Sequence, residues 1–353
     1  MKYYLLLLGF VLLNSCIQDP DPAKKENKAG LRGAFIVNEG NFGKSNASLS
    51  FYDFENHSMQ NNIFKNANGR DLGDQAQSMT IIDTLGLIVV SGSAKIEVIS
   101  INSWKSITTI NMPSGDSPRN IAYGGNGKIY VTDLWGGKVT IIDLATFARE
   151  TMVLVGPNPD EILVYKNKAY VANGGFGFNN TVSVLDLEQG KVTKTITVGD
   201  YPSYLQLDRY DRISVLCQGR WPAWNDTTDK GTDGGIYNIQ PHSDEVEDSL
   251  RISGNVFEYG NDGYNSAYFI KGRMVGNIAV YAVNKNEMLS DTLFSGYYYA
   301  VEADPVTGSV FALDAKDFAQ NGSLKIFDDS GTLLETHETG IIPGAVTFIY
   351  KDE

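Results

Sequence analysis

One pattern occurs twice in the middle of the chain, in Ile129-Tyr-Val-Thr-Asp-Leu-Trp-Gly-Gly-Lys-Val-Thr-Ile-Ile-Asp-Leu144 and in Ala169-Tyr-Val-Ala-Asn-Gly-Gly-Phe-Gly-Phe-Asn-Asn-Thr-Val-Ser-Val-Leu-Asp-Leu187. Each copy has a short apolar run, a loop rich in Gly or Asn, and a second apolar run that ends in Asp-Leu. A third run and a Gly-x-x-Pro turn follow both copies, as in Val155-Gly-Pro-Asn-Pro159 and Val198-Gly-Asp-Tyr-Pro202. Short runs bounded by turn residues predict β-strands.

The pattern extends over most of the chain in seven copies spaced 43 to 52 residues apart. The end of the Asp-Leu strand marks each copy, at Asp53, Ser100, Asp143, Asp186, Asn238, Ala282 and Asp328. This spacing is typical of a four-stranded propeller blade, whereas a helical solenoid needs a 3.6-residue period and a β-helix a shorter repeat. The sequence therefore predicts an all-β fold, a seven-bladed β-propeller.

The two ends of the predicted domain, residues 31–353, complement each other. Gly344–Tyr350 matches an innermost strand that has no blade after it, and Ala34–Val37 matches a second strand with nothing before it. We expect the C-terminal strand to complete the first blade and close the ring, because closure removes exposed sheet edges.

The N-terminus has the features of an export signal. An apolar run, Tyr3–Leu13, is too short to span a membrane, and Leu13-Asn-Ser-Cys16 resembles the lipobox of bacterial lipoproteins. We expect residues 1–15 to be a signal peptide, Cys16 to be lipidated, and residues 16–30 to form a flexible tether to the outer membrane. Cys217 then remains as the one thiol of the domain, and we interpret it as a buried apolar residue.

Charge and motifs narrow the range of functions. The net charge of −13 and the pI near 4.7 argue against nucleic acid as a partner. His57, His242 and His337 fall in three different copies, and none stands beside an acid at a metal or triad spacing. We therefore predict no catalytic residues, no catalytic cofactor and no metal site. Asp226–Asp233 has closely spaced oxygen ligands, but it lacks the ordered spacing of a calcium loop.

A ligand-binding face is predicted where the loops between second and third strands meet the Gly-x-x-Pro turns. Copy five has by far the longest of these loops, Gln218–Gly235, and long loops on a rigid scaffold are usually functional. Large aromatics, Arg and Asn on such loops are typical of recognition surfaces. The candidate ligand-binding residues are Asn38, Asn41, Phe42, Arg119, Trp135, Asp160, Phe176, Phe178, Asn179, Tyr201, Arg220, Trp221, Trp224, Tyr264, Tyr297 and Tyr298.

Several segments carry a resemblance to a known family. The copies resemble the YVTN repeat of YncE-like propellers. Together with the Cys16 lipobox, Asn38-Glu-Gly-Asn-Phe-Gly43 and Ala47-Ser-Leu49, they resemble BtuG-type surface lipoproteins of Bacteroidota. The resemblance implies a seven-bladed propeller outside the cell that binds cobalamin (vitamin B12) and passes it to a TonB-dependent, BtuB-like transporter. Asp19 and Asp21, just after the lipidated Cys, resemble a surface-export signal.

Two other classes of function stay open. One is a module that binds glycans or proteins, since aromatic platforms on loops serve that purpose equally well. The other is a lyase or hydrolase, because streptogramin B lyases have a similar outline. Those enzymes use a His with a metal near the channel, and this chain offers no matching His on that face.

Overall fold

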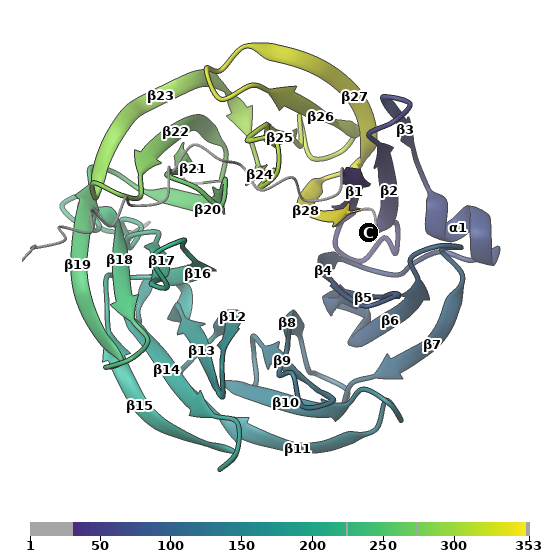
Figure 1. Cartoon of the computed structure of the whole chain (residues 1–353), viewed down its shortest axis with the longest axis horizontal. Helices are drawn as coiled ribbons and strands as arrows, with labels where there is room; N and C mark the ends of the chain where they lie inside the picture. The colour runs from purple at the N-terminus through teal and green to yellow at the C-terminus, as the bar shows by residue number, and fades with distance from the viewer. Residues whose placement is uncertain (1–30, 224, 273, 351–353) are drawn as a thin grey trace, which may run out of the picture.

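The computed structural model describes residues 31–350, apart from 224 and 273. The predicted signal peptide, Cys16 and the tether lie outside the described residues. The described strands form seven four-stranded antiparallel sheets arranged as a ring around a central axis, so the prediction of a seven-bladed propeller is confirmed (Figure 1). No helix in the described part of the chain is long and apolar enough to cross a membrane.

Each blade runs from an inner strand at the axis to an outer strand at the rim. Blade one consists of β28 (Pro343–Tyr350), β1 (Leu31–Asn38), β2 (Ser48–Asp53) and β3 (Ser58–Gln60). Blade two consists of β4 (Ala76–Ile82), β5 (Leu85–Val90), β6 (Lys95–Ser100) and β7 (Ser106–Asn111). Blade three consists of β8 (Pro118–Tyr123), β9 (Lys128–Asp133), β10 (Lys138–Asp143) and β11 (Arg149–Leu154). Blade four consists of β12 (Pro159–Tyr165), β13 (Lys168–Asn173), β14 (Thr181–Asp186) and β15 (Lys191–Thr197).

The remaining three blades follow the same order. Blade five consists of β16 (Pro202–Leu207), β17 (Ile213–Cys217), β18 (Gly234–Gln240) and β19 (Glu245–Ile252). Blade six consists of β20 (Val256–Asn261), β21 (Ser266–Gly272), β22 (Gly276–Ala282) and β23 (Glu287–Tyr298). Blade seven consists of β24 (Ala300–Ala303), β25 (Val310–Asp314), β26 (Asn321–Phe327) and β27 (Leu333–Ile341). Two short 3-10 turns, Ser91–Ser93 and Gly175–Gly177, lie in the loops of blades two and four.

The ring is closed as the sequence predicts. β28 pairs antiparallel with β1, from Tyr350 opposite Leu31 to Pro343 opposite Asn38. The chain therefore supplies the inner strand of blade one from its C-terminal end and the other three strands from its N-terminal end. This arrangement joins the first and last segments of the domain through main-chain hydrogen bonds.

Burial follows the position of each strand in its blade. The second strands are buried on both faces between neighbouring blades, so β9 and β13 are almost continuously buried. The outer strands are more exposed, and along β15 exposed residues alternate with partly or fully buried ones. Cys217 is fully buried near the end of β17, in line with its interpretation as an apolar residue, and burial raises the pKa of its thiol.

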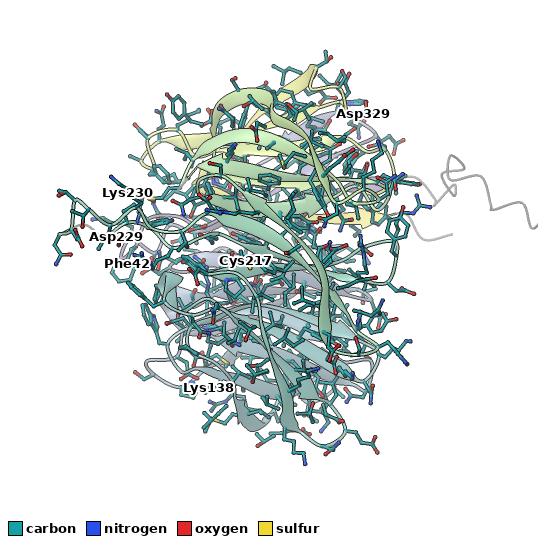
Figure 2. The ribbon with its side chains drawn as sticks, turned by 90° about the vertical axis from the view of Figure 1, so that its left-hand side faces the viewer. Phe42, Lys138, Cys217, Asp229, Lys230 and Asp329 are labelled. Carbon is teal, nitrogen blue, oxygen red and sulfur yellow. The ribbon has the colours of Figure 1, made fainter. Side chains whose placement is uncertain are left out.

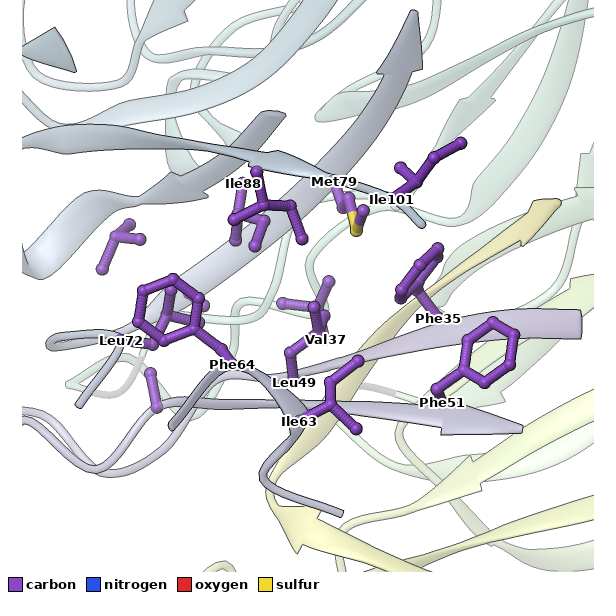
Figure 3. Packing of buried hydrophobic residues seen from close by; sticks show 14 of the residues in the cluster. Phe35, Val37, Leu49, Phe51, Ile63, Phe64, Leu72, Met79, Ile88 and Ile101 are labelled. Atoms are coloured by element: carbon purple, nitrogen blue, oxygen red, sulfur yellow. The ribbon is translucent and has the colours of Figure 1, made fainter. Parts of the chain in front are cut away.

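Blade one has an unusual outer layer. Its outer strand, β3, has only three residues, and the helix α1 (Ile63–Asn68) covers the rest of the edge. Ile63 and Phe64 are each 1% exposed and pack on Leu49 and on apolar residues of blade two (Figure 3). Burial of two large side chains stabilises this short helix, which is below the length that is stable alone.

Candidate functional site

One face of the ring collects the loops that the sequence singled out. The loops between second and third strands open here, as do the turns that lead into the inner strands, because both join strand ends on the same side. Figure 2 shows Phe42 of blade one on the same side as Asp229 and Lys230 of blade five, which project beyond the blade ends. The loop of blade five spans residues 218–233 between β17 and β18, as predicted.

An aromatic ridge crosses this face over blades three to five. We use this name for Trp135, Phe176, Phe178, Tyr201 and Trp221. Trp135 and Phe176 come from different blades, yet their ring centroids lie 5.2 Å apart. Trp135 is 65% exposed and Phe178 is 81% exposed, values that are unusual for rings of this size.

The ridge continues from blade four into blade five through Gly177. A Cβ at this position would lie 3.4 Å from the Cα of Arg220 and 3.5 Å from a ring carbon of Tyr201. Gly177 also has a φ of +90°, which a side chain rarely tolerates. The glycine therefore lets the loops of blades four and five approach each other closely.

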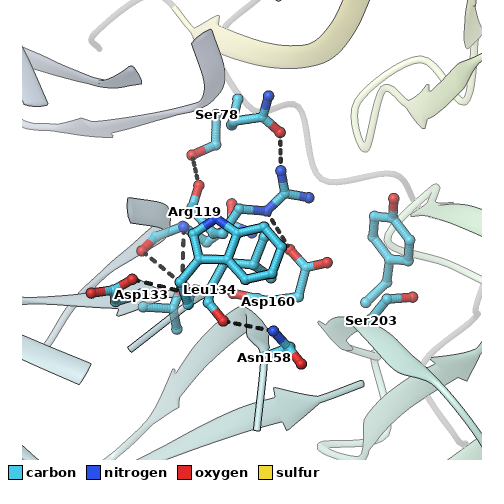
Figure 4. A network of polar contacts seen from close by, with 12 residues as sticks. Ser78, Arg119, Asp133, Leu134, Asn158, Asp160 and Ser203 are labelled. Atoms are coloured by element: carbon cyan, nitrogen blue, oxygen red, sulfur yellow. Dashed lines mark hydrogen bonds and ion pairs between the residues drawn. The ribbon is translucent and has the colours of Figure 1, made fainter. Parts of the chain in front are cut away.

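The loop of blade three is held rigidly below Trp135. The buried Asp133 accepts hydrogen bonds from the main-chain N–H groups of Ser117, Trp135 and Gly136, and Lys138 lies 3.2 Å from its other oxygen. Burial alone would raise the pKa of Asp133, but these donors outweigh it and hold that pKa below its usual value. Asn158 of the next blade donates to the carbonyl of Leu134, which joins two loops of the face (Figure 4).

The loop of blade five is held by an internal ion pair. Both terminal nitrogens of Arg220 bond the two oxygens of Asp229, at 2.5 and 2.7 Å. Asp229 also accepts hydrogen bonds from the N–H groups of Ala223 and Gly231, and together with Arg220 these donors lower its pKa. The guanidinium of Arg220 is thus engaged within the loop, where it also donates to the carbonyl of Trp221, and its contact with a ligand stays a prediction.

The acidic residues of the same loop do not converge. The carboxylate of Asp226 accepts from Thr228, and that of Asp233 pairs with Arg251 and accepts from the N–H of Gly254. Within the described ranges, no three His, Cys, Asp or Glu side chains are arranged to hold a metal ion.

A polar cavity of about 460 Å³ lies on the propeller axis beside the ridge. Six inner strands carry a register shift near their first residue, and a β-bulge turns successive side chains toward the same side. Gln77, Arg119 and Asp160 consequently line the cavity, where Arg119 Nε lies 3.2 Å from Asp160 and its terminal nitrogen donates to Gln77. Figure 4 shows Arg119 directed toward Asp160.

Most of the charged residues that line this cavity carry carboxyl groups. They are Glu39, Asp160, Glu161, Glu258 and Glu302. Burial, with the neighbouring Asp160, raises the pKa of Glu161 to about 8, and burial raises the pKa of Glu302 to about 8. Burial also raises the pKa of Glu39 and of Glu258, which accept hydrogen bonds from Tyr299 and Tyr204. Burial therefore favours the protonated form of these carboxyl groups.

Sequence reasoning did not find the three cavity residues Glu161, Glu258 and Glu302. The sequence signal that points to them is their position near the first residues of the inner strands. Glu161, for example, directly follows the predicted residue Asp160. Arg119, Asp160 and Tyr201 were predicted and do lie together at the cavity and the ridge, and burial followed by Asp160 raises the pKa of Tyr201 to about 12.

Some predicted residues are not available to a ligand. Asn38 is fully buried and its amide bonds Ser48 and Ser50, and Tyr298 is 3% exposed in the core between blades six and seven. Tyr264 lies in the turn between β20 and β21, on the opposite face of the ring, so its predicted placement is wrong.

The other predicted residues are accessible to different degrees. Phe42 is 77% exposed and Tyr297 is 76% exposed, both outside the ridge. The side-chain amide of Asn41 donates to the carbonyl of Phe318, and that of Asn179 to the carbonyl of Asn173, so both amides shape their loops. Trp224 lies outside the described residues.

The fold and this face define a seven-bladed propeller with an aromatic, loop-built surface over an acidic axial cavity. Residues 32–208 match the family model described as a domain of unknown function, DUF5074, and the chain belongs to that family. No curated protein matches the chain.

Solved structures share the fold at low sequence identity. One is a chain of Kuenenia stuttgartiensis hydrazine synthase, with a TM-score of 0.61 and 13% identity, covering 76% of this chain and 92% of that chain. Another is a quinonprotein alcohol dehydrogenase-like protein from Bacteroides thetaiotaomicron, with a TM-score of 0.67 and 13% identity, covering 91% of this chain and 79% of that chain. At this identity the likeness concerns the fold alone.

Proposed function

We propose that this protein is a non-catalytic capture module that binds cobalamin on the aromatic ridge and delivers it to a TonB-dependent transporter. The observation that carries the proposal is the 5.2 Å contact between the exposed rings of Trp135 and Phe176, which belong to neighbouring blades. Large exposed aromatics on rigid loops are characteristic of binding surfaces rather than of a solvated rim. The resemblance to BtuG-type lipoproteins suggests the particular ligand.

The chemistry of the face complements a corrin. A corrin has a broad apolar face and several primary amides at its edge, so it needs flat apolar side chains flanked by polar groups. The ridge supplies the rings. Asp160 and Arg119 lie beside it at the mouth of the cavity and provide an acceptor and donors for amide groups.

Rigidity supports the same function. Asp133 holds the loop of blade three and the Arg220–Asp229 pair holds the loop of blade five, so little main-chain freedom is lost when a ligand binds. A preformed surface binds more tightly than one that must be ordered first. Capture of a scarce nutrient requires such affinity.

Titration calorimetry with cyanocobalamin tests the proposal. We expect a one-to-one isotherm, and we expect the joint substitution Trp135→Ala/Phe176→Ala to weaken binding by at least ~2 kcal/mol, as for the loss of interface anchors. Tyr123→Ala, which removes an exposed ring from the far end of β8, is the matched control and should bind normally. A titration without heat, together with no thermal shift, would refute cobalamin as the ligand. Glycan arrays would then examine the adhesion alternative.

The cellular part of the proposal is an outer-membrane lipoprotein that faces the exterior and is anchored through Cys16. The net charge of −13 and the lipobox are compatible with that location. Metabolic labelling with a fatty acid should mark the wild-type protein and leave Cys16→Ala unlabelled. Labelling of the variant would contradict the anchor without affecting the ligand hypothesis.

A further inference from the structure

Two of the three histidines meet one carboxylate at the seam between the first and last blades. His57 Nδ1 lies 2.6 Å from one oxygen of Glu335, and His337 Nε2 lies 2.7 Å from the other. No sequence spacing indicates this cluster, because the first histidine lies 278 residues before the glutamate. His57 belongs to the turn between β2 and β3 of blade one, whereas Glu335 and His337 lie on β27 of blade seven.

A tyrosine completes the cluster. The hydroxyl of Tyr52 on β2 donates to Glu335 at 2.6 Å, and its ring lies 4.9 Å from the ring of His337. The side chain of Glu335 is 26% exposed, that of His337 is 18% exposed, and that of His57 is 67% exposed. Protons can thus reach the cluster from solvent, while the carboxylate stays partly sheltered.

Few other charges face this cluster. On blade one, Asp53 and Glu55 lie at the same turn, and the Asp53 carboxylate accepts hydrogen bonds from main-chain N–H groups of that turn. On blade seven, Lys325 is directed away, toward Asp314 and the ring of Tyr298. Glu338 accepts from Asn321. The two histidines are consequently the groups that can acquire a positive charge against Glu335.

The surroundings of Glu335 favour its charged form. Burial alone would raise the pKa of Glu335, but hydrogen bonds from Tyr52, His337 and His57 outweigh it, and the net pKa lies below its usual value. Burial and the hydrogen bond to Glu335 raise the pKa of Tyr52, so its hydroxyl keeps its proton. Histidine is the side chain whose charge ordinarily changes between about pH 5 and 8.

We propose that His57, Glu335 and His337 form a pH-dependent latch that tightens the closure of the propeller ring in mild acid. In neutral solution the imidazoles donate uncharged hydrogen bonds to the carboxylate. Protonation converts both into charge-assisted bonds, which are roughly twice as strong. Because β27 and β28 are consecutive strands of blades seven and one, a stronger latch opposes separation of the two blades.

Native-state hydrogen exchange of the full-length protein tests the latch. After correction for intrinsic exchange, we expect the amides of β27 and β28 to be protected severalfold more at about pH 5.5 than at about pH 8, because charge-assisted hydrogen bonds are roughly twice as strong as neutral ones. Glu335→Gln should abolish this difference. Should that variant fail to fold, His57→Asn at the exposed turn replaces it and should reduce the difference.

His242→Asn is the matched control, because His242 is exposed on blade five, away from the seam. It should leave the pH dependence of β27 and β28 unchanged. The proposal is overturned if protection of these strands is the same at both pH values in the wild type. It is equally overturned if Glu335→Gln or His57→Asn retains the full difference.

Discussion

The indole of Trp135 and the phenyl ring of Phe176 belong to different blades, and their centroids lie 5.2 Å apart at a mutual tilt of 36°. Trp135 is 65% exposed and Phe176 is 46% exposed, so their contact contributes little to the folding of either blade. Phe176 also adopts a φ of 52°, a backbone conformation that is costly for a non-glycine residue. An exposed pair held in a strained conformation is more consistent with binding than with stability.

Replacing either ring by alanine should weaken ligand binding more than it lowers the stability of the fold. We predict that Trp135→Ala and Phe176→Ala each lower the free energy of unfolding by less than ~1.5 kcal/mol, the usual limit for an aromatic pair beyond its area burial. Each substitution should also weaken the free energy of ligand binding by more than this amount. Chemical denaturation and calorimetry on the same variants measure the two effects. Equal losses in both would indicate that the rings serve stability.

The Arg220–Asp229 ion pair should control the order of the blade-five loop. Asp229→Asn removes the charge that holds both guanidinium nitrogens, so we predict faster proteolysis within residues 218–233 and binding weakened on the order of tenfold. Asp226→Asn is the matched control, because that carboxylate bonds only within its own turn, at Thr228. Similar cleavage of both variants would contradict a positioning role for Asp229.

The axial carboxyls should make the protein less stable in alkali. The pKa of Glu161 is about 8 in the fold against 4.5 for an ordinary glutamate, so the folded state retains a proton that the unfolded chain releases. The stability from this group is full below about pH 4.5 and is lost as the pH rises through about 8. Wild-type stability should therefore fall over this interval.

The substitution Glu161→Gln should remove part of this loss of folding stability at alkaline pH. At about pH 8.5 we predict that the variant is more stable than the wild type by at least ~1 kcal/mol, since one pKa unit corresponds to about 1.4 kcal/mol. Urea denaturation across the pH range measures this difference in stability. Glu188→Gln is the control, because Glu188 is exposed. A variant that follows the wild-type pH profile would show that Glu161 is ionised in the folded protein at neutral pH.

The sequence predicted the ring because each blade repeats the same strand ends and turns. The predicted order of the strands within each blade also predicted which loops share a face of the ring. It thereby placed Trp135, Phe176 and Trp221 on one face. Blade six has a degenerate repeat, so Tyr264 was assigned to the wrong turn. Tyr297 and Tyr298 are adjacent in β23, and a one-residue difference decides that the first is exposed and the second is buried.

Other features arise only from the closed ring. His57 and Glu335 lie 278 residues apart in sequence and meet because β28 joins the last blade to the first. Glu161 and Glu258 converge because bulges in two separate inner strands direct them to one cavity, and single-sequence patterns do not encode register shifts. Long-range contacts of this kind require the three-dimensional arrangement.

Ring closure yields the last prediction. A chain that ends at Gly340 lacks β28, which leaves blade one without its inner strand and removes Phe348 from its ring contact with Phe311. The edge of β1 would then be exposed on a three-stranded blade, and exposed edges promote aggregation. We predict loss of the cooperative thermal transition and insolubility, whereas a chain ending at Tyr350 should unfold like the wild type. If the shorter chain unfolds cooperatively at the wild-type temperature, closure by β28 does not stabilise the fold.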